Sequence, residues 1–226
     1  MRFIICFFVF FMCCNVSSQQ KTVNNSAQGT NFQLQNFTSD AKNSGANDGS
    51  YKGTFLLFND WKNNGSVQIT GKKYALNSVN FNVQNNEFMY KNGEKGIFTI
   101  APNHIDFVHI KNKSFKYHLY KDEHKFFEIL FESKKRLSLF KGYHIRILPK
   151  SELGMLSRPL DEIKKEEKFY VKNGIELVVL KLKKKDILKF IDKDKQNAIL
   201  KFVKERSLSY KKEKDILEIF KYYDKI

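Results

Sequence analysis

Four residues in the middle of the chain carry imidazole or carboxylate groups: His104, Asp106, His118 and His124. His104 and Asp106 stand two apart on a predicted strand, so their side chains should share one face. His118 falls on the next predicted strand, and His124 lies in the turn that follows it. Such a set at one end of a hairpin would suit zinc, copper or nickel. Because the spacing matches no standard metal motif, turn and strand-surface positions are the preferred interpretation, and a metal-dependent enzyme is the alternative.

Other catalytic patterns are missing from the sequence. It has no Gly-x-Ser-x-Gly nucleophile turn. The glycines of Gly93-Glu94-Lys95-Gly96 belong to a predicted hairpin and not to a phosphate-binding loop between a strand and a helix. A carboxylate pair for glycoside cleavage would form only in the fold, so the sequence leaves that chemistry open. We therefore predict no catalytic residue, no cofactor site and no metal site, and leave enzymatic activity as an open question.

The chain is strongly basic, with 40 Lys and Arg residues against 24 Asp and Glu residues and a formal net charge of +16 at pH 7. Few of the basic residues are Arg, the side chain that suits planar contact with phosphate. The lysines are interleaved with acidic residues, as in Lys164–Lys168. We expect a solvated basic surface. A module that binds an acidic polymer is the alternative, and specific nucleic-acid binding is not expected.

Residues 1–18 have the three parts of a secretory signal peptide. Arg2 supplies positive charge, Phe3–Cys14 is an unbroken apolar run, and small residues end at Ser18. The run is shorter than the roughly 20 residues that a membrane-spanning helix needs. Cleavage before Gln19 would remove all three cysteines (Cys6, Cys13 and Cys14) and leave no disulfide and no transmembrane segment. We predict an exported protein that is periplasmic, envelope-associated or extracellular, with lipidation at Cys14 as the less favoured alternative.

The elements that would position any site follow from the hydrophobic pattern. Residues 19–50 are rich in Asn, Ser, Gln and Thr and predict a flexible linker. Residues 51–148 show short runs with period two, such as Val79, Phe81 and Val83, separated by turn signals such as Asn92-Gly93. This pattern predicts an antiparallel β meander, either a sandwich or a partly open barrel. Its later strands are expected at 96–101, 104–110, 115–120, 126–131, 136–140 and 143–148.

The last third of the chain changes in character. Residues 149–167 are polar and contain two prolines, which predicts a connecting loop. Residues 168–226 should form a hairpin that turns at Asn173-Gly174, followed by a small helical cap. Helices are expected at about 186–191, 194–206 and 212–224. The complete chain is therefore expected to be an α+β protein whose core must hold without disulfides.

This C-terminal part also carries a resemblance. The segments LKLKKKDILKFI (180–191), FVKERSLSY (202–210) and EKDILEIFKYY (213–223) resemble the C-terminal region of uncharacterised secreted proteins of Gram-negative Bacteroidetes bacteria. The resemblance implies a periplasmic or envelope location and transfers no functional residue. Together with the absence of reaction motifs, it favours a non-enzymatic binding or structural component of a bacterial envelope, with an unknown partner.

Overall fold

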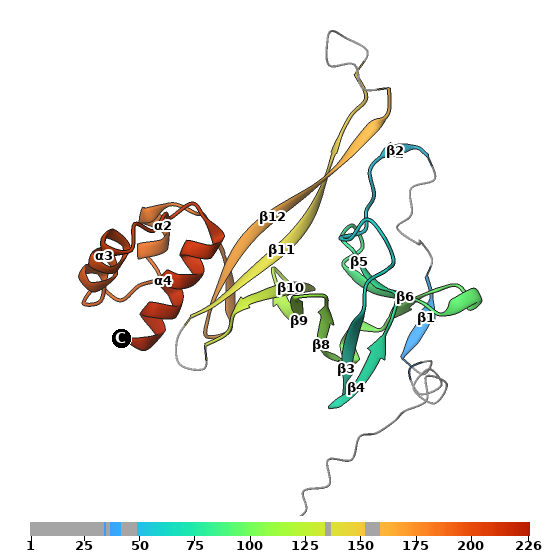
Figure 1. Ribbon diagram of the computed structural model, residues 1–226, viewed down its shortest axis with the longest axis horizontal. Coiled ribbons are helices and arrows are strands. Elements are labelled where there is room, and N and C mark those ends of the chain that lie inside the picture. Colours follow the sequence, from blue (N-terminus) through green and yellow to red (C-terminus); the bar gives the residue numbers. More distant parts are fainter. Residues whose placement is uncertain (1–33, 35–36, 42–48, 134–136, 152–158) are drawn as a thin grey trace, which may run out of the picture.

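The computed structural model describes residues 34, 37–41, 49–133, 137–151 and 159–226, so the expected signal peptide lies outside the described residues (Figure 1). The described part of the chain forms two β-sheets and three helices. The smaller sheet has the order β1 (Thr38–Asp40), β7 (Ile97–Ile100), β6 (Glu87–Lys91) and β5 (Val79–Asn82).

The larger sheet is antiparallel along its whole path. Its order is β13 (Glu176–Leu180), β12 (Asp161–Asn173), β11 (Ser138–Leu148), β10 (Glu123–Phe131), β9 (Lys113–Tyr120), β8 (Ile105–Ile110), β3 (Gly65–Ile69) and β4 (Lys72–Leu76). A short strand, β2 (Tyr51–Lys52), pairs with β12 in parallel.

The two sheets pack face to face and enclose the main core. Phe81 and Phe88 of the smaller sheet lie with ring centroids 4.7 Å apart, and Phe88 meets Phe115 of β9 at 5.2 Å. Phe126 of β10 approaches Phe88 edge-on at 4.7 Å. Such edge-to-face pairs add to the hydrophobic stabilisation of buried rings. The prediction of an α+β fold with a β meander is confirmed, and the packing is sandwich-like.

The polar residues between the core positions of β5 are buried as well, because another segment covers them. The Asn80 side chain accepts a hydrogen bond from the backbone N–H of Phe58 (3.1 Å) and donates to the carbonyls of Phe58 and Asp60 (both 2.9 Å). The Asn80 side chain thus makes the backbone hydrogen bonds that a neighbouring strand would otherwise make with residues 58–60. A buried amide needs such partners, since an unpaired polar group is costly.

The three helices form a second core at the other end of the large sheet. These helices are α2 (Lys184–Leu188), α3 (Gln196–Glu205) and α4 (Glu213–Lys225), close to the predicted ranges. Ile216 and Phe220 of α4 pack with Leu139 of β11 and Val171 of β12. No helix in the described ranges is both long and apolar enough to cross a membrane.

Both cores lie on one face of the large sheet. Leu139 belongs to the helical core and Tyr143 to the sandwich core, and residues four apart on β11 point to the same side. Lys141 stands between them and is buried, with 4% of its surface exposed. The opposite face carries a separate hydrophobic cluster of three aromatic residues and one leucine: Phe127, Phe140, Tyr170 and Leu177.

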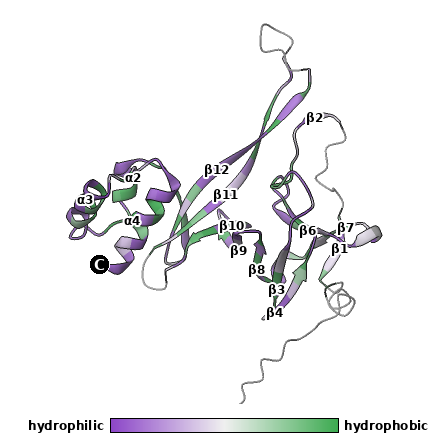
Figure 2. Ribbon diagram, viewed as in Figure 1, coloured by the Kyte–Doolittle hydropathy of each residue, from purple (hydrophilic) through white to green (hydrophobic). Residues whose placement is uncertain are grey.

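Two expected boundaries are wrong. Part of the predicted 19–50 linker is ordered, because β1 pairs with β7 and Leu34 is buried in the main core. Residues 161–167 of the predicted 149–167 loop belong to β12, which pairs with β11 along the whole length of that strand. The two form the long twisted hairpin in Figure 1. Much of β12 is hydrophilic (Figure 2), because cross-strand pairs such as Arg146 and Glu166 replace an apolar face.

Strand β11 also differs from expectation, since the predicted strands 136–140 and 143–148 are one continuous strand, Ser138–Leu148. Gly142 lies where a turn was expected. A Cβ atom at Gly142 would stand 2.8 Å from Cε2 of Tyr170 and 3.1 Å from Cε1 of Phe127. Glycine is therefore needed for the close approach of two rings and not for a turn.

Candidate functional site: a cavity in the fork between β10 and β11

The first two candidate metal ligands have separate structural roles. His104 lies in a 3-10 turn, Pro102–His104, just before β8, and its ring packs against Phe37 at 5.3 Å. The prediction that it shares a strand with Asp106 is therefore wrong. Asp106 accepts a hydrogen bond from the backbone N–H of Gly71 at 2.8 Å and so fixes the β3–β4 turn.

The other two candidates face opposite sides of the large sheet. In the register of β9 and β10, His118 is opposite Lys125, whereas His124 is opposite Leu119. His118 packs edge-on against the Phe140 ring at 4.8 Å, and His124 stacks on Tyr117. Across the described ranges, no group of three or more His, Cys, Asp or Glu side chains could hold a metal ion. The proposed convergence of ligands does not occur.

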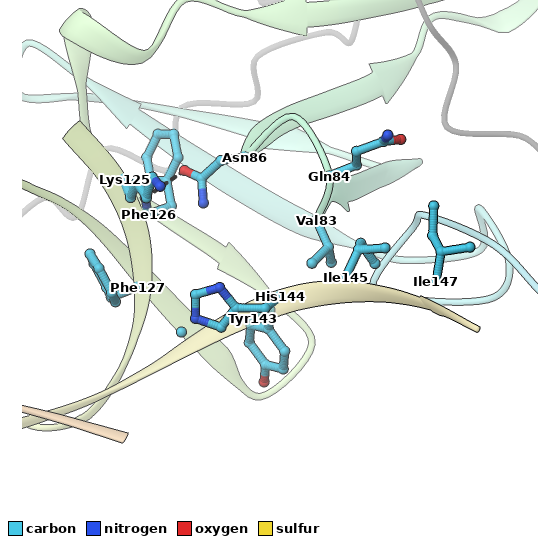
Figure 3. Close-up of a pocket in the computed structure, with 11 residues that line it drawn as sticks. Val83, Gln84, Asn86, Lys125, Phe126, Phe127, Tyr143, His144, Ile145 and Ile147 are labelled. Carbon is cyan, nitrogen blue, oxygen red and sulfur yellow. Dashed lines mark hydrogen bonds between the residues drawn. The ribbon is translucent and has the colours of Figure 1, made fainter. Parts of the chain in front are cut away.

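The structure instead opens a cavity where the large sheet splits. Strands β10 and β11 pair only between Glu128–Lys141 and Phe131–Leu139. Beyond this short ladder β10 follows β9, while β11 continues with β12, and the two diverge. Figure 3 shows the resulting fork, with the β5–β6 turn across it. The cavity measures about 440 Å³ and is lined by Val83, Gln84, Asn86, Lys125, Phe126, Phe127, Gly142, Tyr143, His144, Ile145 and Ile147.

A side-chain hydrogen bond holds the β5–β6 turn against β10. Asn86 accepts from the backbone N–H of Phe126 at 2.7 Å. Asn86 has a φ of 58°, a left-handed conformation that asparagine tolerates better than most residues. Asn82 shapes the same turn by accepting from the backbone N–H groups of Gln84 and Asn85. The Asn85-Asn86 pair is a turn signal in the sequence, but the contact of this turn with residue 126 has no signal there.

The walls of the cavity are mainly apolar, from Val83, two Phe residues and two Ile residues. Of the described residues that line it, Lys125 alone carries a charge. The Lys125 ammonium lies 2.6 Å from the Glu123 carboxylate, which is two-thirds exposed. An ion pair this exposed to water contributes little to stability, so this partner can be exchanged for a bound anion. The cavity therefore combines an apolar interior with one available cation.

His144 supplies a neutral hydrogen-bonding group on the opposite wall. Its Nε2 lies 2.9 Å from the Tyr170 hydroxyl. Burial, with the charges of Lys168 and Lys125, lowers the pKa of His144, so the imidazole is neutral at pH 7. Burial raises the pKa of Tyr170 to about 12, which keeps its hydroxyl protonated. When Tyr170 donates to Nε2, Nδ1 carries the ring proton and is a donor.

Tyr143 takes part in a different network beneath the cavity. Its hydroxyl points away from the other lining residues in Figure 3 and donates to the Glu128 carboxylate. Lys113 Nζ lies 2.9 and 3.0 Å from the two Glu128 oxygens and 3.0 Å from the Tyr143 hydroxyl. Burial, then the hydrogen bond to Glu128, raises the pKa of Tyr143, so it stays a neutral donor at physiological pH.

A buried polar seam is formed by the polar groups of Lys113, Glu128, Tyr143 and Lys141. Lys141 is the member that contacts a helix. Its Nζ lies 2.6 Å from the carboxylate of Glu213 in α4 and 3.3 Å from that of Glu167 in β12. Burial alone would lower the pKa of Lys141, but the hydrogen bond to Glu213 and the neighbouring carboxylates outweigh it and raise the pKa. The seam lies between the sandwich core and the helical core. The ion pair between Lys141 and Glu213 of α4 links the large sheet to the helices.

His118 makes folding sensitive to pH. Burial, with the charges of Lys172 and Lys116, lowers its pKa to about 4 from the usual 6.5. The unfolded chain therefore binds more protons than the native state between these values, and stability falls as pH falls through that window. We expect a loss of about 1–2 kcal/mol between pH of about 7 and 5. Urea unfolding should show that His118→Phe removes this part of the slope.

His104→Gln is the matched control for that measurement, because His104 is exposed and lies at the start of β8. The slope of stability against pH in His118→Phe is compared with the slope in this variant. His144 also has a lowered pKa, so a residual slope is expected in His118→Phe. An unchanged slope in His118→Phe would contradict the assignment.

The residues of the fork cavity escaped sequence analysis because they share no motif. His144 lies on a predicted strand, whereas Lys125 was expected in the turn before residues 126–131 and belongs to β10 instead. Their meeting depends on where the β10–β11 ladder stops. Comparisons with protein-family models, with curated proteins and with solved structures find no match for this chain.

Proposed function

We propose that the protein is an exported binding protein and that the fork cavity holds a small amphipathic organic anion. The observation that carries this proposal is the composition of the cavity: apolar walls with Lys125 as the sole charged residue among the described lining residues. Its volume of about 440 Å³ lies in the range of small-molecule sites. The site offers hydrogen-bond donors and an apolar surface, which favours binding over catalysis.

The arrangement assigns a part of the ligand to each wall. An apolar body would lie against Phe127, Ile145 and Ile147 and lose contact with water. Its anionic group would meet the Lys125 ammonium, with the Nδ1–H of His144 as a neutral second donor. At roughly 0.3 kcal/mol per non-hydrogen atom, a ligand of about 20 such atoms would bind with a Kd in the range of about 10–100 µM.

The location of the protein is part of the same proposal. The pattern of residues 1–18 and the resemblance of the C-terminal segments support export to a bacterial envelope. Intact-mass measurement of the protein from its natural source tests this part. A chain that begins at Gln19 is expected, and one that still begins at Met1 contradicts it.

Two fluorescent probes with one skeleton test the ligand class. 8-Anilinonaphthalene-1-sulfonate carries an anionic group, and N-phenyl-1-naphthylamine has the same apolar body without it. We expect both to bind with enhanced fluorescence, and the sulfonate to bind more tightly. Lys125→Gln should weaken the binding of the sulfonate by about three- to tenfold, which corresponds to one charge-assisted contact of about 0.6–1.4 kcal/mol. The affinity of the neutral probe should stay within about twofold of its original value.

Lys73→Gln is the control, because Lys73 is an exposed lysine on the distant strand β4. It should change the affinity of neither probe by more than about twofold. If neither probe binds, the proposal of a binding cavity fails. If Lys125→Gln and Lys73→Gln weaken the binding of the sulfonate equally, binding reflects the net charge of the protein alone and the assignment of the site to the fork is wrong.

A further inference from the structure

The two edges of the large sheet differ in how they are protected. Strand β4 forms one edge and carries the exposed Lys72 and Lys73, the kind of residues that prevent one sheet edge from pairing with another. Strand β13 forms the other edge, where Val178 and Val179 are each 40% exposed. Ile175, in the turn just before this strand, is 92% exposed. The β13 edge therefore offers backbone hydrogen-bonding groups beside apolar side chains, without the protection found on β4.

An apolar groove runs along this edge. It has a volume of about 590 Å³ and lies between residues 175–179 and the β9–β10 turn. Leu119 contributes to its wall and is 50% exposed, although it is a large apolar residue. A contiguous exposed patch of this kind marks a surface that binds another protein. An unpaired strand at its side would accept an extended segment as an additional strand.

The charges along the edge run from acidic to basic. Asp122 and Glu176 lie at the end where β13 begins and line the groove together with Lys121, which leaves this end with one net negative charge. The other end continues into four lysines within five residues: Lys181, Lys183, Lys184 and Lys185. All four are exposed. A strand that binds here in the antiparallel direction must therefore be basic at its C-terminal end and acidic at its N-terminal end.

We propose that β13 pairs antiparallel with β13 of a second copy of this chain, about a two-fold axis near Val178. Antiparallel pairing about this axis sets Glu176 opposite Leu180 of the other strand and places the acidic end of each strand beside the lysine-rich end of the other, so this attraction occurs twice. A uniformly acidic or uniformly basic peptide would match one end of the edge and be repelled at the other. The edge strand itself has the charge order and the apolar centre that this edge requires.

The interface expected from one strand pair is small, so the dimer should be reversible and concentration-dependent. Sedimentation of the purified protein over a dilution series should show a monomer–dimer equilibrium. Val178→Lys places like charges next to each other across the two-fold axis and should raise the dimer Kd by at least about tenfold. Ala75→Lys adds a lysine at an exposed position of β4 and should leave the Kd within about twofold.

A charge exchange tests the orientation of the strands. Glu176→Lys alone should weaken the dimer, because it brings like charges together at both ends of the pair. The double variant Glu176→Lys/Lys181→Glu restores opposite charges and should return the Kd to within about threefold of the original. Circular dichroism confirms that each variant is folded. A protein that stays monomeric, a dimer unaffected by Val178→Lys, or a double variant weaker than Glu176→Lys would overturn the proposal.

Discussion

Replacing Glu128 with alanine is expected to lower the free energy of unfolding by about 3–5 kcal/mol. The carboxylate is buried and meets both the Lys113 ammonium and the Tyr143 hydroxyl. Its loss leaves one charge and one hydroxyl without their partner at the boundary between the two cores. Lys113 retains some access to water, with a quarter of its side chain exposed, which places the expected loss toward the lower end of that range.

Urea unfolding of matched variants measures this effect. Glu132→Ala is the control, because Glu132 also pairs with a lysine of β9, Lys116, at 2.8 Å but is 41% exposed. That variant should lose less than about 1 kcal/mol. Glu128→Gln keeps an acceptor for Tyr143 and should fall between the two. Equal losses in Glu128→Ala and Glu132→Ala would show that the buried seam does not contribute as described.

The second large effect is expected at Gly65, which lies in close contact with both its neighbouring strand β8 and strand β5 of the other sheet. A Cβ atom at this position would stand 2.3 Å from the carbonyl oxygen of His109 and 2.6 Å from Cγ1 of Val79. The first of these atoms is backbone in the neighbouring strand β8, so it cannot rotate away. Gly65→Ala should therefore cost about 3 kcal/mol and lower Tm by roughly 6–12 °C.

Gly71→Ala separates this steric effect from the usual cost of replacing glycine. Gly71 has a φ of +80° in the β3–β4 turn, but its Cβ would meet nothing within 4 Å. Only conformational strain is expected there, about 1–2 kcal/mol. Thermal unfolding of both variants should rank Gly65→Ala as clearly the less stable. The reverse order would contradict the close approach of β3, β5 and β8.

The sequence predicts the sandwich strands because each has one face in a core. Val79 and Phe81 alternate with polar residues, and this period of two identifies β5 correctly even though Asn80 is buried. The same criterion misses residues 161–167 of β12, because Ile163 is the only apolar residue among them and no period of two is visible. Strand pairing there is specified by the partner strand β11 and by cross-strand charges, which a single segment does not reveal.

The candidate site shows a different limit. His118 and His124 were grouped because they are close in sequence, but the pleat of neighbouring strands directs them to opposite faces. The fork cavity joins Asn86, Lys125 and His144, which are far apart along the chain. Its existence depends on where the β10–β11 ladder stops, at the Glu128–Lys141 pair, beyond which the two strands diverge. Such a local break in pairing has no sequence pattern of its own.

The position of a bound anion is the most direct test of the proposed function. Nuclear magnetic resonance of the ¹⁵N-labelled protein can follow backbone amides while 8-anilinonaphthalene-1-sulfonate is added. The largest shifts should occur at Lys125, Phe127, Gly142 and His144, around the fork between β10 and β11. Shifts concentrated instead along the β13 groove, at residues 119–122 and 175–179, would contradict the account.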